Sequence, residues 1–566
     1  MRWFLLNPDQ NTVSSVKKAF RTSEVIARVL ANRKILNPNL ARPFFTPNLD
    51  MLHNPYLMQD MDKAVERVLT NINSGKPIMV FGDYDVDGTT GAAALYLAFQ
   101  KFGADVTYYI PDREKEGYGL SYHGIEVAKD IGIDLIITCD CGINAFVQVD
   151  FANEQNIDII ITDHHTTDIE LPKAHAILNP KREDCGYPFK GLCGGGVAFK
   201  LITAIGNELK IPLTDYEEII PLITLGTAAD VVPIKDENRV IVHHGLNILE
   251  NLEKPGLKTL LELAGLKGHI SVEQLVFSIA PRINAAGRIG DANRAVELLV
   301  TDDQDKARLL AKELDNENKR RQIIQQAVVD EALLKVNAEA DLKNENALVL
   351  ANAGWHPGVV GIVASKIKEE FNRPTIIIAL ENGSGKGSAR SVAGFDLYEA
   401  LTACKTHLDD YGGHPMAAGL TLSNKKLEDF KKAFINFANE RLTEENLQAT
   451  LTLDSEIALQ DITPRFMEFL DKLSPYGPGN MRPKFAIRNA EIAGAPKVIG
   501  KTGEHIRFKI RQGLKSCSAV GFGLSNKYEM LITGQPVDIA CVVETNEWQG
   551  NTSIQMNVRD IKRAVM

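Results

Sequence analysis

Hydrophobic and polar positions follow two different periods along this chain, and the change between them divides it into regions. From about residue 60 to residue 165, short continuous apolar runs such as Ile78–Phe81 alternate with longer amphipathic stretches. Continuous apolar runs between helices are typical of parallel strands buried on both faces. This part of the chain therefore predicts an α/β fold with a mostly parallel sheet covered by helices.

The pattern changes three times after residue 165. Residues 190–300 read as mainly helical, and residues 301–337 are helix-forming throughout, without Gly or Pro. As one helix this stretch would reach roughly 55 Å at ~1.5 Å per residue; a pair of shorter helices is the alternative. A second α/β pattern follows at 345–442, and short alternating strands after about 450 predict a small β-barrel or sandwich.

The chain has 566 residues, which is too long for one hydrophobic core. We expect an N-terminal segment (1–50), an α/β domain (51–300), a connecting helix (301–344), a second α/β domain (345–445) and an OB-like β-barrel (450–566). The N-terminal segment shows one amphipathic helical stretch near Ser23–Leu36 and then a Pro/Asn-rich connection. Its sequence indicates no role.

Composition bounds the cellular setting. No run approaches the ~18 apolar residues that a membrane span needs, and the first residues lack a long apolar signal region. Seven scattered cysteines argue against a secreted disulfide framework. Cys139 and Cys141 flank Asp140, but no second pair follows at zinc-finger spacing. We therefore expect a cytoplasmic protein without membrane contact.

Candidate chemistry begins directly after the first apolar strand. Asp83, Asp85 and Asp87 stand at every second position, so in an extended segment their carboxylates converge. Gly88 and Gly91 then allow a tight turn into a helix. Three like charges on one side of a turn repel each other unless a cation lies among them. The stretch predicts one wall of a divalent-metal site.

Three further apolar segments end in similar residues. One strand ends in Asp140, the next in Asp163, His164 and His165, and an apolar segment of helical character ends in Asp230. In parallel sheets, ligand-binding groups gather beyond the carboxyl ends of the strands. A single Asp at such an end is more often a capping or turn residue. Four ends of this kind in one α/β unit favour a shared site.

The residue types indicate which metal would bind. Carboxylates outnumber imidazoles and no thiolate is required, which suits Mn²⁺ or Mg²⁺ better than Zn²⁺. The candidate ligands exceed the needs of one ion, so we expect two ions about 3.5–4 Å apart, a pair suited to phosphoryl displacement. The residues alone thus predict a two-metal phosphoesterase.

The motifs resemble a known family. GDYDVDGTTG, CDCG, TDHH, GTAADVVP, PRINAAGR and GGHPMAAG stand in the order of the DHH phosphoesterase superfamily, and from about residue 45 onward the chain is similar to the RecJ single-strand-specific exonucleases. The resemblance implies a DHH domain, a DHH-associated (DHHA1-like) domain and a C-terminal OB-fold. It implies Asp85, Asp87, Asp140, His164 and Asp230 as direct metal ligands. Asp83 is then a ligand or an immediate neighbour, and His165 faces the scissile phosphate or the leaving oxygen, so that Asp140, His164 and His165 form the catalytic group.

Several basic motifs predict contacts to the substrate. In PRINAAGR, Arg282 and Arg288 around Asn284 could clamp phosphate oxygens, or could form a structural loop with solvated arginines. Arg113 precedes a Gly-Tyr-Gly turn whose Tyr118 could stack on a base or simply pack.

The second α/β domain carries another basic motif, GSGKGSARS, which we expect to be a Gly-rich loop after a strand. It is not a Walker A loop, because Gly387 follows Lys386 where Ser or Thr belongs. By the resemblance this domain faces the metals, so Ser388 and Arg390 are expected to hold a terminal phosphate of the substrate. His414, in GGHPMAAG, is either a substrate contact or a structural cap.

The C-terminal region has the positive charge that the whole-chain net charge of −10 conceals. From residue 481 to 566, 13 Lys and Arg stand against 7 Asp and Glu. In the strand EHIRFKIRQ, alternation sends Arg507, Lys509 and Arg511 to the face opposite the core. One basic strand face in a small barrel is typical of an OB-type single-strand binder, and a solvated strand face is the alternative.

Together these observations and the resemblance imply a function. We expect an exonuclease that degrades single-stranded DNA from the 5′ end to nucleoside 5′-monophosphates by two-metal hydrolysis, in DNA repair and recombination. The resemblance alone supplies DNA, polarity and single-strand preference. We expect a monomer that acts beside a helicase and a single-strand-binding protein. The alternatives are a DHH-type phosphodiesterase of short oligoribonucleotides or cyclic dinucleotides, and a non-catalytic replication scaffold.

Overall fold

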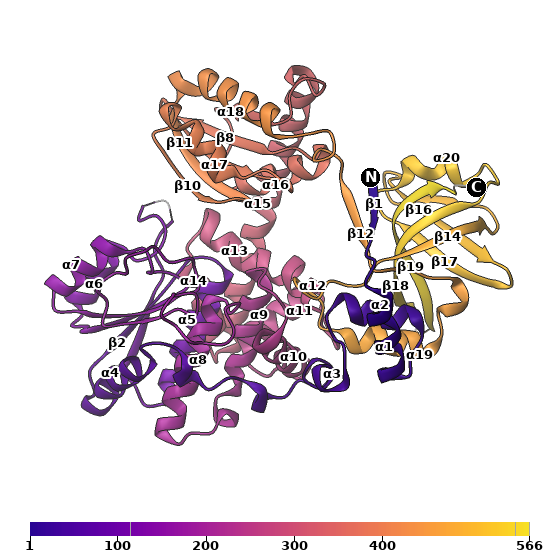
Figure 1. The fold of residues 1–566 in the computed structure, drawn as a ribbon. Coiled ribbons are helices and arrows are strands. Elements are labelled where there is room, and N and C mark those ends of the chain that lie inside the picture. Colours follow the sequence, from indigo (N-terminus) through magenta and orange to yellow (C-terminus); the bar gives the residue numbers. More distant parts are fainter. Residues whose placement is uncertain (114, 549–550, 565–566) are drawn as a thin grey trace. The chain divides into compact units, whose positions relative to one another are not determined.

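The chain folds into two compact units in a computed structural model that describes residues 1–113, 115–548 and 551–564. Unit 1 comprises residues 1–2, 281–291 and 309–450, and unit 2 comprises residues 3–280, 292–308 and 451–566. The two units are described separately. Figure 1 shows the path of the chain through them.

Unit 2 begins with a five-stranded parallel sheet in the order β3-β2-β4-β5-β6. Its strands are β2 (Ile78–Gly82), β3 (Val106–Tyr109), β4 (Leu135–Cys139), β5 (Asp158–Thr162) and β6 (Ala176–Leu178). Every residue of β2 and β4 is buried, as expected for strands covered on both faces. Helices α6 (Tyr122–Asp130) and α7 (Phe146–Glu154) cover one face, and α4 (Met61–Ser74), α5 (Val86–Lys101) and α8 (Gly194–Leu209) pack on the other side. The predicted parallel sheet is confirmed.

The region predicted to be mainly helical is helical in the structure. It contains α8, α9 (Ile220–Ala229), α10 (Asp236–Leu249), α11 (Pro255–Leu263), α12 (Val272–Gln274) and α14 (Asn293–Val300). Helix α9 is buried along almost its whole length, because it packs between α5 and α10. This burial explains its uniformly apolar sequence.

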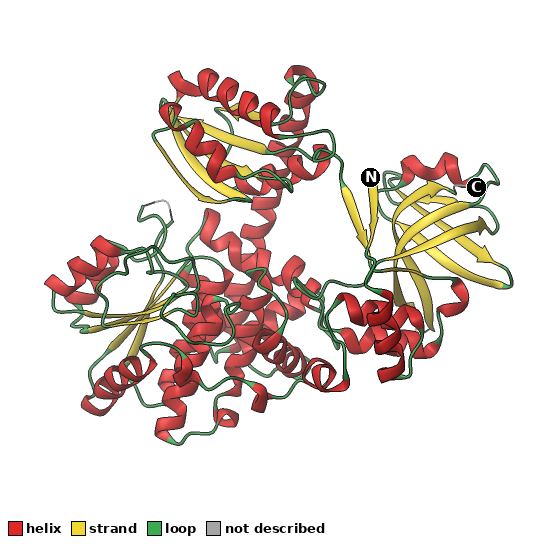
Figure 2. Cartoon of the chain, in the orientation of Figure 1, coloured by secondary structure: helices red, strands yellow, loops and turns green. Residues whose placement is uncertain are grey.

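The C-terminal module of unit 2 is a β-barrel. Its strands are β13 (Ser455–Glu456), β14 (Phe485–Ile492), β15 (Lys497–Ile499), β16 (His505–Gln512), β17 (Lys515–Gly521), β18 (Val537–Trp548) and β19 (Asn551–Arg563), with α19 (Pro464–Leu473) and α20 (Tyr528–Leu531) beside them. The sheet runs β13-β14-β18-β19-β17-β16-β15, and β14 also pairs with β16. This extra pairing closes the sheet into the barrel of strands visible in Figure 2.

The N-terminal residues belong to the same core as this barrel. The sequence predicts one helix near Ser23–Leu36, but the structure has three: α1 (Gln10–Phe20), α2 (Glu24–Asn32) and α3 (Pro38–Phe45). Val13, Ile26 and Leu30 are buried in one cluster with Phe466 and Ile487 of the C-terminal module. Strand β1 (Arg2–Leu5) forms a two-stranded sheet with β12 (Thr450–Leu453).

Unit 1 contains a five-stranded mixed sheet in the order β10-β11-β9-β8-β7. Its elements are α13 (Ala280–Ile289), α15 (Gln304–Glu339), β7 (Leu348–Asn352), α16 (Val360–Phe371), β8 (Thr375–Glu381), β9 (Ser384–Arg390), α17 (Leu397–Ala403), β10 (Asp410–His414), β11 (Ala417–Ser423) and α18 (Leu427–Arg441). Helix α15 is a single helix of 36 residues, so the alternative of two shorter helices is wrong. It carries the chain from unit 2 into unit 1, since the division falls between residues 308 and 309.

One motif predicted to be a loop, and another for which a loop was the alternative, adopt regular structure. The segment GSGKGSARS is strand β9, paired antiparallel with β8 on one side and β11 on the other. Its backbone N–H groups therefore serve the sheet and do not form a phosphate-binding loop. PRINAAGR lies on helix α13, which excludes the alternative of a structural loop.

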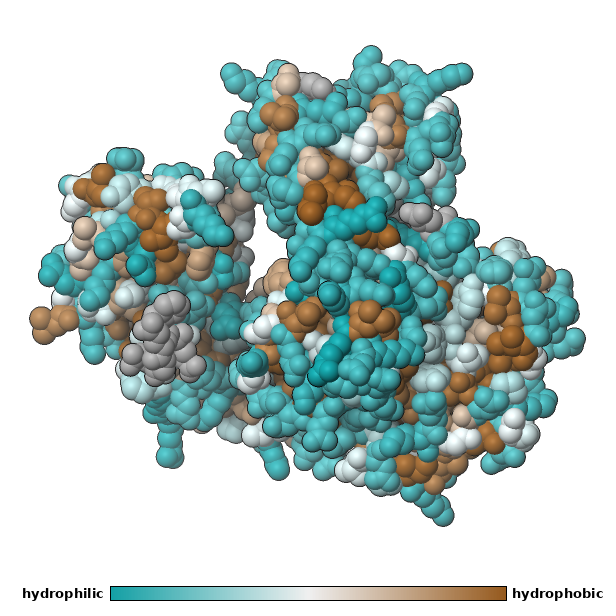
Figure 3. Space-filling model, turned by 180° about the vertical axis from the view of Figure 1, so that it is seen from behind, coloured by the Kyte–Doolittle hydropathy of each residue, from teal (hydrophilic) through white to brown (hydrophobic). Residues whose placement is uncertain are grey.

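The helices that the structure describes were compared with the length and hydropathy of a membrane span. Among the residues that the structure describes, no helix combines the length and the apolar character needed to cross a membrane. The face drawn in Figure 3 is mainly hydrophilic, with hydrophobic side chains in separate patches.

Candidate metal centre and substrate contacts

The acidic strand ends of unit 2 meet at one edge of the parallel sheet. Residues after β2, β4 and β5 and the residue that caps α9 contribute three overlapping sets of ligand atoms, within 4.8 Å of one another in each set. The sets are Asp83, Asp85 and Asp140; Asp87, His164 and Asp230; and Asp140, His164 and His165. Every predicted metal ligand therefore lies in this one centre. Asp140 and His164 each belong to two sets, an arrangement suited to two neighbouring ions.

Asp87 is held by the N-terminus of helix α8. Its carboxylate accepts hydrogen bonds from the backbone N–H groups of Gly194 (2.6 Å) and Gly195 (3.1 Å). At Gly194 a Cβ atom would lie 2.5 Å from the Cβ of Asp140, so only glycine permits this approach. The unpaired N–H groups of a helix start favour an anion at this position. Sequence reasoning missed this role of the GGG stretch, although three glycines at a helix start were its signal.

Asp85 and Asp83 occupy the turn between β2 and α5. Asp85 is the N-cap of α5 and accepts a hydrogen bond from the Gly88 N–H (3.0 Å). Asp83 is buried, with only 2% of its surface exposed. Asp85 and Asp87 fall in different ligand sets, so the turn contributes to both halves of the centre.

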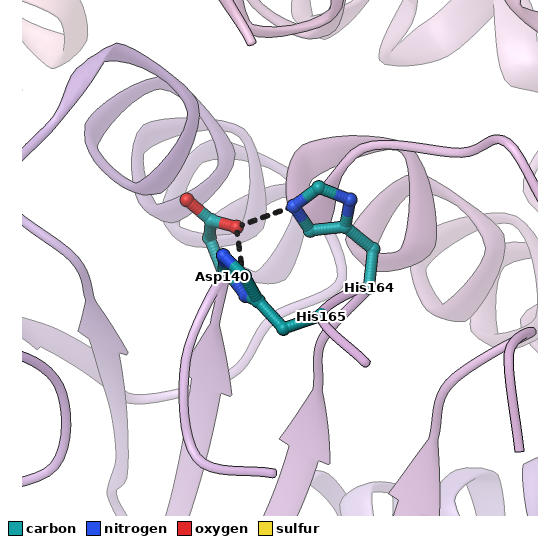
Figure 4. Close-up of side chains that lie close together, drawn as sticks. All are labelled: Asp140, His164 and His165. Atoms are coloured by element: carbon teal, nitrogen blue, oxygen red, sulfur yellow. Dashed lines mark ion pairs between the residues drawn. The ribbon is translucent and has the colours of Figure 1, made fainter. Parts of the chain in front are cut away.

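The two histidine rings lie next to each other and face the same carboxylate oxygen of Asp140, as Figure 4 shows. His164 Nε2 is 3.1 Å from Asp140 Oδ1 and 3.5 Å from Asp230 Oδ2. His165 Nδ1 is 3.9 Å from Asp140 Oδ1. Asp140 itself has a left-handed φ of 63°, a strained conformation of the kind that gathers at functional sites.

Asp163 orients His165. Its Oδ1 lies 2.7 Å from His165 Nδ1 and accepts the backbone N–H groups of His164 and His165, while Oδ2 accepts the Ile143 N–H. These contacts fix the ring of His165 and leave Asp163 little capacity to bind a metal directly. We placed Asp163 at a strand end from the sequence but did not assign it this role.

The pKa values of the centre show that the carboxylates repel each other. Burial, and then the charge of Asp85, raise the pKa of Asp87 to about 6. Burial, Asp87 and Asp85 raise the pKa of Asp230 to about 8, and burial with neighbouring carboxylates raises those of Asp83 and Asp140. A bound cation would relieve this repulsion.

The histidine pKa values move in opposite directions. Burial, with the neighbouring charge of His165, lowers the pKa of His164 to about 3, so its ring stays neutral, the state that binds a metal. Burial opposes charge on His165 as well, but its hydrogen bond to Asp163 and that carboxylate's charge raise its pKa. His165 is thus disposed to hold a proton, and His164 is not.

Unpartnered buried atoms provide a direct test of whether these residues fit a metal. Among the described residues, Asp83 Oδ1, Asp140 Oδ1, both ring nitrogens of His164 and Asp230 Oδ2 are buried without a hydrogen-bond partner. Buried polar atoms in native structures are almost always satisfied. All of these atoms belong to predicted ligands, so the donor set fits divalent cations that prefer oxygen and imidazole.

Arg113 and Tyr118 lie beside the metal centre. The Tyr118 hydroxyl donates to the Asp140 carbonyl (3.0 Å), and its ring meets His165 edge-on at 6.1 Å, yet 56% of the residue is exposed. The Arg113 guanidinium lies over the ring of Tyr84, 5.2 Å from its centre. Together these side chains form an aromatic and basic wall beside the metal centre. The Tyr118 hydroxyl is already bonded to the Asp140 carbonyl, so only its ring is available to a substrate.

The arginines of PRINAAGR make contacts within unit 1. Arg282 Nε donates to Asp315 Oδ1 of α15 (2.9 Å), and Arg288 Nη1 donates to the Gly358 carbonyl before α16 (3.1 Å). Asn284 is half-buried on the same helix. These contacts tie α13 to α15 and to the start of α16.

Ser388 and Arg390 are on one side of β9, two residues apart. Arg390 Nη1 donates to Ser388 Oγ (3.0 Å) and to the Ala389 carbonyl (2.8 Å). The guanidinium and this hydroxyl each approach Gly361, in the first turn of α16, to 3.1 Å from where its Cβ would be. Burial lowers the pKa of Arg390, and its partners among the described residues include no carboxylate. His414 is exposed at the end of β10.

The predicted basic face of β16 has the expected alternation. Ile506, Phe508 and Ile510 are buried, and the three basic residues between and after them are exposed. Arg511 bonds Glu491 through Nε (3.0 Å) and Nη2 (2.7 Å). The charge of Arg511 is therefore partly neutralised by Glu491, and Arg507 and Lys509 contribute more of the positive charge of this face.

Comparison with known proteins agrees with this geometry. Models of the DHH family N-terminal domain, the DHHA1 domain and the RecJ OB domain match residues 77–227, 344–441 and 453–560. The chain is 38% identical over 563 residues to the single-stranded-DNA-specific exonuclease RecJ of Bacillus subtilis (strain 168), covering 99% of this chain and 70% of that protein.

Solved structures give the same result. A crystal structure of RecJ from Thermus thermophilus in complex with Mn²⁺ has a TM-score of 0.86 and 30% identity, covering 100% of this chain and 80% of that one. The same protein in complex with Mg²⁺ gives a TM-score of 0.79 and 29% identity, covering 100% and 79%.

Proposed function

The chain belongs to the RecJ family of single-stranded-DNA-specific exonucleases, and on this premise we propose that it degrades single-stranded DNA from the 5′ end to nucleoside 5′-monophosphates. The observation that carries the proposal is the set of buried, unpartnered carboxylate and imidazole atoms at the strand ends of unit 2. Relatives of known structure bind Mn²⁺ and Mg²⁺, and the oxygen-rich donor set suits both ions.

The metal ligands we propose are Asp83, Asp85, Asp87, Asp140, His164 and Asp230. Two divalent cations held there supply activation of water and stabilisation of the attacking and leaving oxygens. Asp163 holds His165 through Nδ1, so the proton available to substrate is the one on Nε2. His165 then donates that proton to the leaving oxygen, in keeping with its raised pKa.

The substrate contacts follow from the basic groups of each unit. In unit 2, Tyr118 and Arg113 contact the nucleotide at the metal centre, and the β16 face binds the strand further along. In unit 1, Ser388 and Arg390 bind a terminal phosphate. A half-buried guanidinium that has no carboxylate partner among the described residues favours an anion, and the start of α16 supplies further N–H donors. Arg282, Asn284, Arg288 and His414 are the remaining proposed contacts.

The domain division that we propose is the one expected from the sequence. It comprises an N-terminal segment (1–50), a DHH domain (51–300), a connecting helix (301–344), a DHHA1-like domain (345–445) and an OB-like domain (450–566). The matched family models support a DHH, a DHHA1-like and an OB-like domain within these limits, and α15 spans most of the connecting segment. We also propose a cytoplasmic monomer that works in repair and recombination, where a helicase supplies single strands and a single-strand-binding protein covers them.

The test is hydrolysis of DNA labelled at the 5′ or the 3′ end, as single strand and as blunt duplex, with a short RNA alongside. Each is incubated with Mn²⁺, Mg²⁺ or EDTA. We expect label to leave the 5′ end first, from single strands only, and only with a metal. Release from the 3′ end first, or equal rates on duplex, would contradict the proposal.

Asp140→Asn is the matched variant, because it keeps the shape of the side chain and removes its charge. Since Asp140 belongs to two ligand sets, we expect turnover to fall at least about 1,000-fold while DNA binding is largely retained. Turnover near the wild-type rate would show that the metal assignment is wrong.

A further inference from the structure

A loop of the C-terminal module packs against the segment that follows the metal ligand Asp230. The loop is residues 475–480, with the sequence PYGPGN, and the segment is residues 231–235. The backbone N–H of Ile234 donates to the Pro478 carbonyl at 2.7 Å. Ile234 is fully buried, and a Cβ at Gly477 would lie 2.5 Å from Ile234 Cγ1. The two segments are therefore in close contact, four residues from a metal ligand.

The loop is fixed from both sides. Buried Asn480 donates to the carbonyls of Leu473 and Pro475, and it accepts a hydrogen bond from Arg33, which follows α2. Arg239 of α10 donates to the carbonyls of Ser474 and Pro475, at 2.7 and 3.0 Å. The Arg239 side chain is buried, with no carboxylate among these partners. Its guanidinium donates only to carbonyls in these contacts, of Ser474 and Pro475 at the start of the loop and of Phe44 in α3, so α10 helps to fix the loop.

The segment itself is in a conformation that needs support. Val231, the residue after Asp230, has a φ of 62°. A β-branched side chain rarely adopts this left-handed conformation, which persists only where the surroundings impose it. The hydrogen bond to Ile234 is one such constraint. Another is Asn238 of α10, which donates to the Pro233 carbonyl at 3.0 Å.

Asn238 also connects this segment to the start of α8, whose N–H groups hold Asp87. Asn238 also donates to the Gly191 carbonyl at 2.6 Å. Gly191 precedes Gly194 by three residues, and Gly194 is the residue whose N–H holds Asp87. The loop, the 231–235 segment and Asn238 thus form a continuous path to both Asp230 and the anchor of Asp87.

From these contacts we infer that the loop 475–480 of the C-terminal module is a positioning element of the metal centre, acting through Ile234 on Asp230 and through Asn238 on the anchor of Asp87. The inference rests on the proposed function of the centre and assigns the C-terminal module a second role besides strand binding. The loop residues touch neither metal nor substrate. They act through the residues that do, as supporting contacts of metal sites commonly do.

The test uses the full chain and the variant Gly477→Ala, whose new methyl group presses on Ile234. We expect the dissociation constant for Mn²⁺, measured by calorimetry on DNA-free protein, to rise about 10-fold. We expect kcat on a 5′-phosphorylated trinucleotide to fall by a similar factor. The double variant Gly477→Ala/Ile234→Ala, which makes room for the methyl group, should recover most of both losses.

Two glycine controls separate this role from general damage. Gly186→Ala places a methyl group in open space, and Gly521→Ala strains the barrel, where Ile506 and Leu524 lie 3.0 Å from the new Cβ. Both should keep the wild-type affinity for Mn²⁺. A wild-type affinity in Gly477→Ala, or an equal loss in Gly521→Ala, would overturn the inference. If the wild-type protein does not cleave the trinucleotide, the proposed function is contradicted. The inference about the loop is then tested by the Mn²⁺ affinities alone.

Discussion

At Asp87, burial and a neighbouring carboxylate make the ionised state of the metal centre unfavourable. Its carboxylate accepts two backbone N–H groups of α8, which favour the ionised form, and its pKa is nevertheless raised to about 6. Burial and the charge of Asp85 outweigh the hydrogen bonds. The fold therefore holds carboxylates together at a cost that a cation offsets.

This balance predicts how metal-free protein responds to pH. The folded-state pKa values of Asp87 and Asp230, about 6 and about 8, lie above the ordinary value of about 3.9 for an unfolded aspartate. The folded state then binds more protons, so this stabilising contribution is complete below about pH 4 and is lost as pH rises through 6 and 8. In EDTA we expect the melting temperature to fall between about pH 5 and pH 9, and the stabilisation by Mn²⁺ to grow over the same range.

Asp230→Asn is the control for this prediction. It removes the carboxylate with the higher of the two pKa values and keeps its size. In EDTA its melting temperature should depend less on pH than that of the wild type, and Mn²⁺ should stabilise it less. An unchanged pH dependence would show that Asp230 does not carry the effect.

Much of the centre was predictable residue by residue, because each ligand directly follows an apolar run and parallel strands end at one edge. The support for the ligands was not. Gly194 and Gly195 lie more than 100 positions from Asp87, and their role depends on where α8 begins in space. Asp163, His164 and His165 are adjacent, and the sequence does not show that the Asp163 carboxylate turns to the backbone N–H groups of the other two.

Among the elements, β9 is a strand where the sequence predicted a loop. Its glycines suggested a loop, but tertiary pairing with β8 and β11 overrides the weak strand preference of glycine. A strand still places Ser388 and Arg390 on one side, since they are two residues apart. The proposed phosphate contact therefore depends on side chains, with the backbone committed to the sheet.

The contact predicts a preference for phosphorylated ends. Arg390→Lys keeps a positive charge but loses the planar guanidinium that can bind two phosphate oxygens. For a 5′-phosphorylated single strand we expect kcat/KM to fall about 10- to 100-fold, and for a 5′-hydroxyl strand to change little. The ratio of the two kcat/KM values is the measurement. An unchanged ratio in Arg390→Lys and in Ser388→Ala would remove this pair from the phosphate site.

Sequence reasoning succeeded best for long elements. The single helix α15 follows from a long stretch without Gly or Pro, where local preference and length agree. The helix α3 was missed because it is short and contains Pro43, and α1 was missed although it is longer than the predicted α2. Such helices are stabilised by packing on a distant part of the chain, which no local pattern records.

At the scale of the whole molecule, the barrel has a basic face although the chain as a whole is acidic. Net charge is −10, yet β16 presents a basic face. Phosphate contacts make affinity depend on salt, with a slope of about 0.7 per contact on single strands. Local charge, which is what a strand meets, therefore matters more than the total.

The double variant Arg507→Ala/Lys509→Ala tests this face. We expect weaker binding of a long single strand and a slope of log K against log salt that is shallower by about 1.4, for two lost contacts. Arg511→Ala is the matched comparison and should have a smaller effect, because Arg511 already bonds Glu491. Affinity and slope can be measured by fluorescence anisotropy across a salt series. If Arg511→Ala lowered the affinity and the salt slope as much per residue as the double variant does, the smaller role given to Arg511 would be wrong.

The core shared by the first and last parts of the chain has a consequence for biosynthesis. Val13, Ile26 and Leu30 are synthesised more than 400 residues before their packing partners Phe466 and Ile487. The apolar faces of the amphipathic helices α1 and α2 therefore stay uncovered until the C-terminal module has been synthesised.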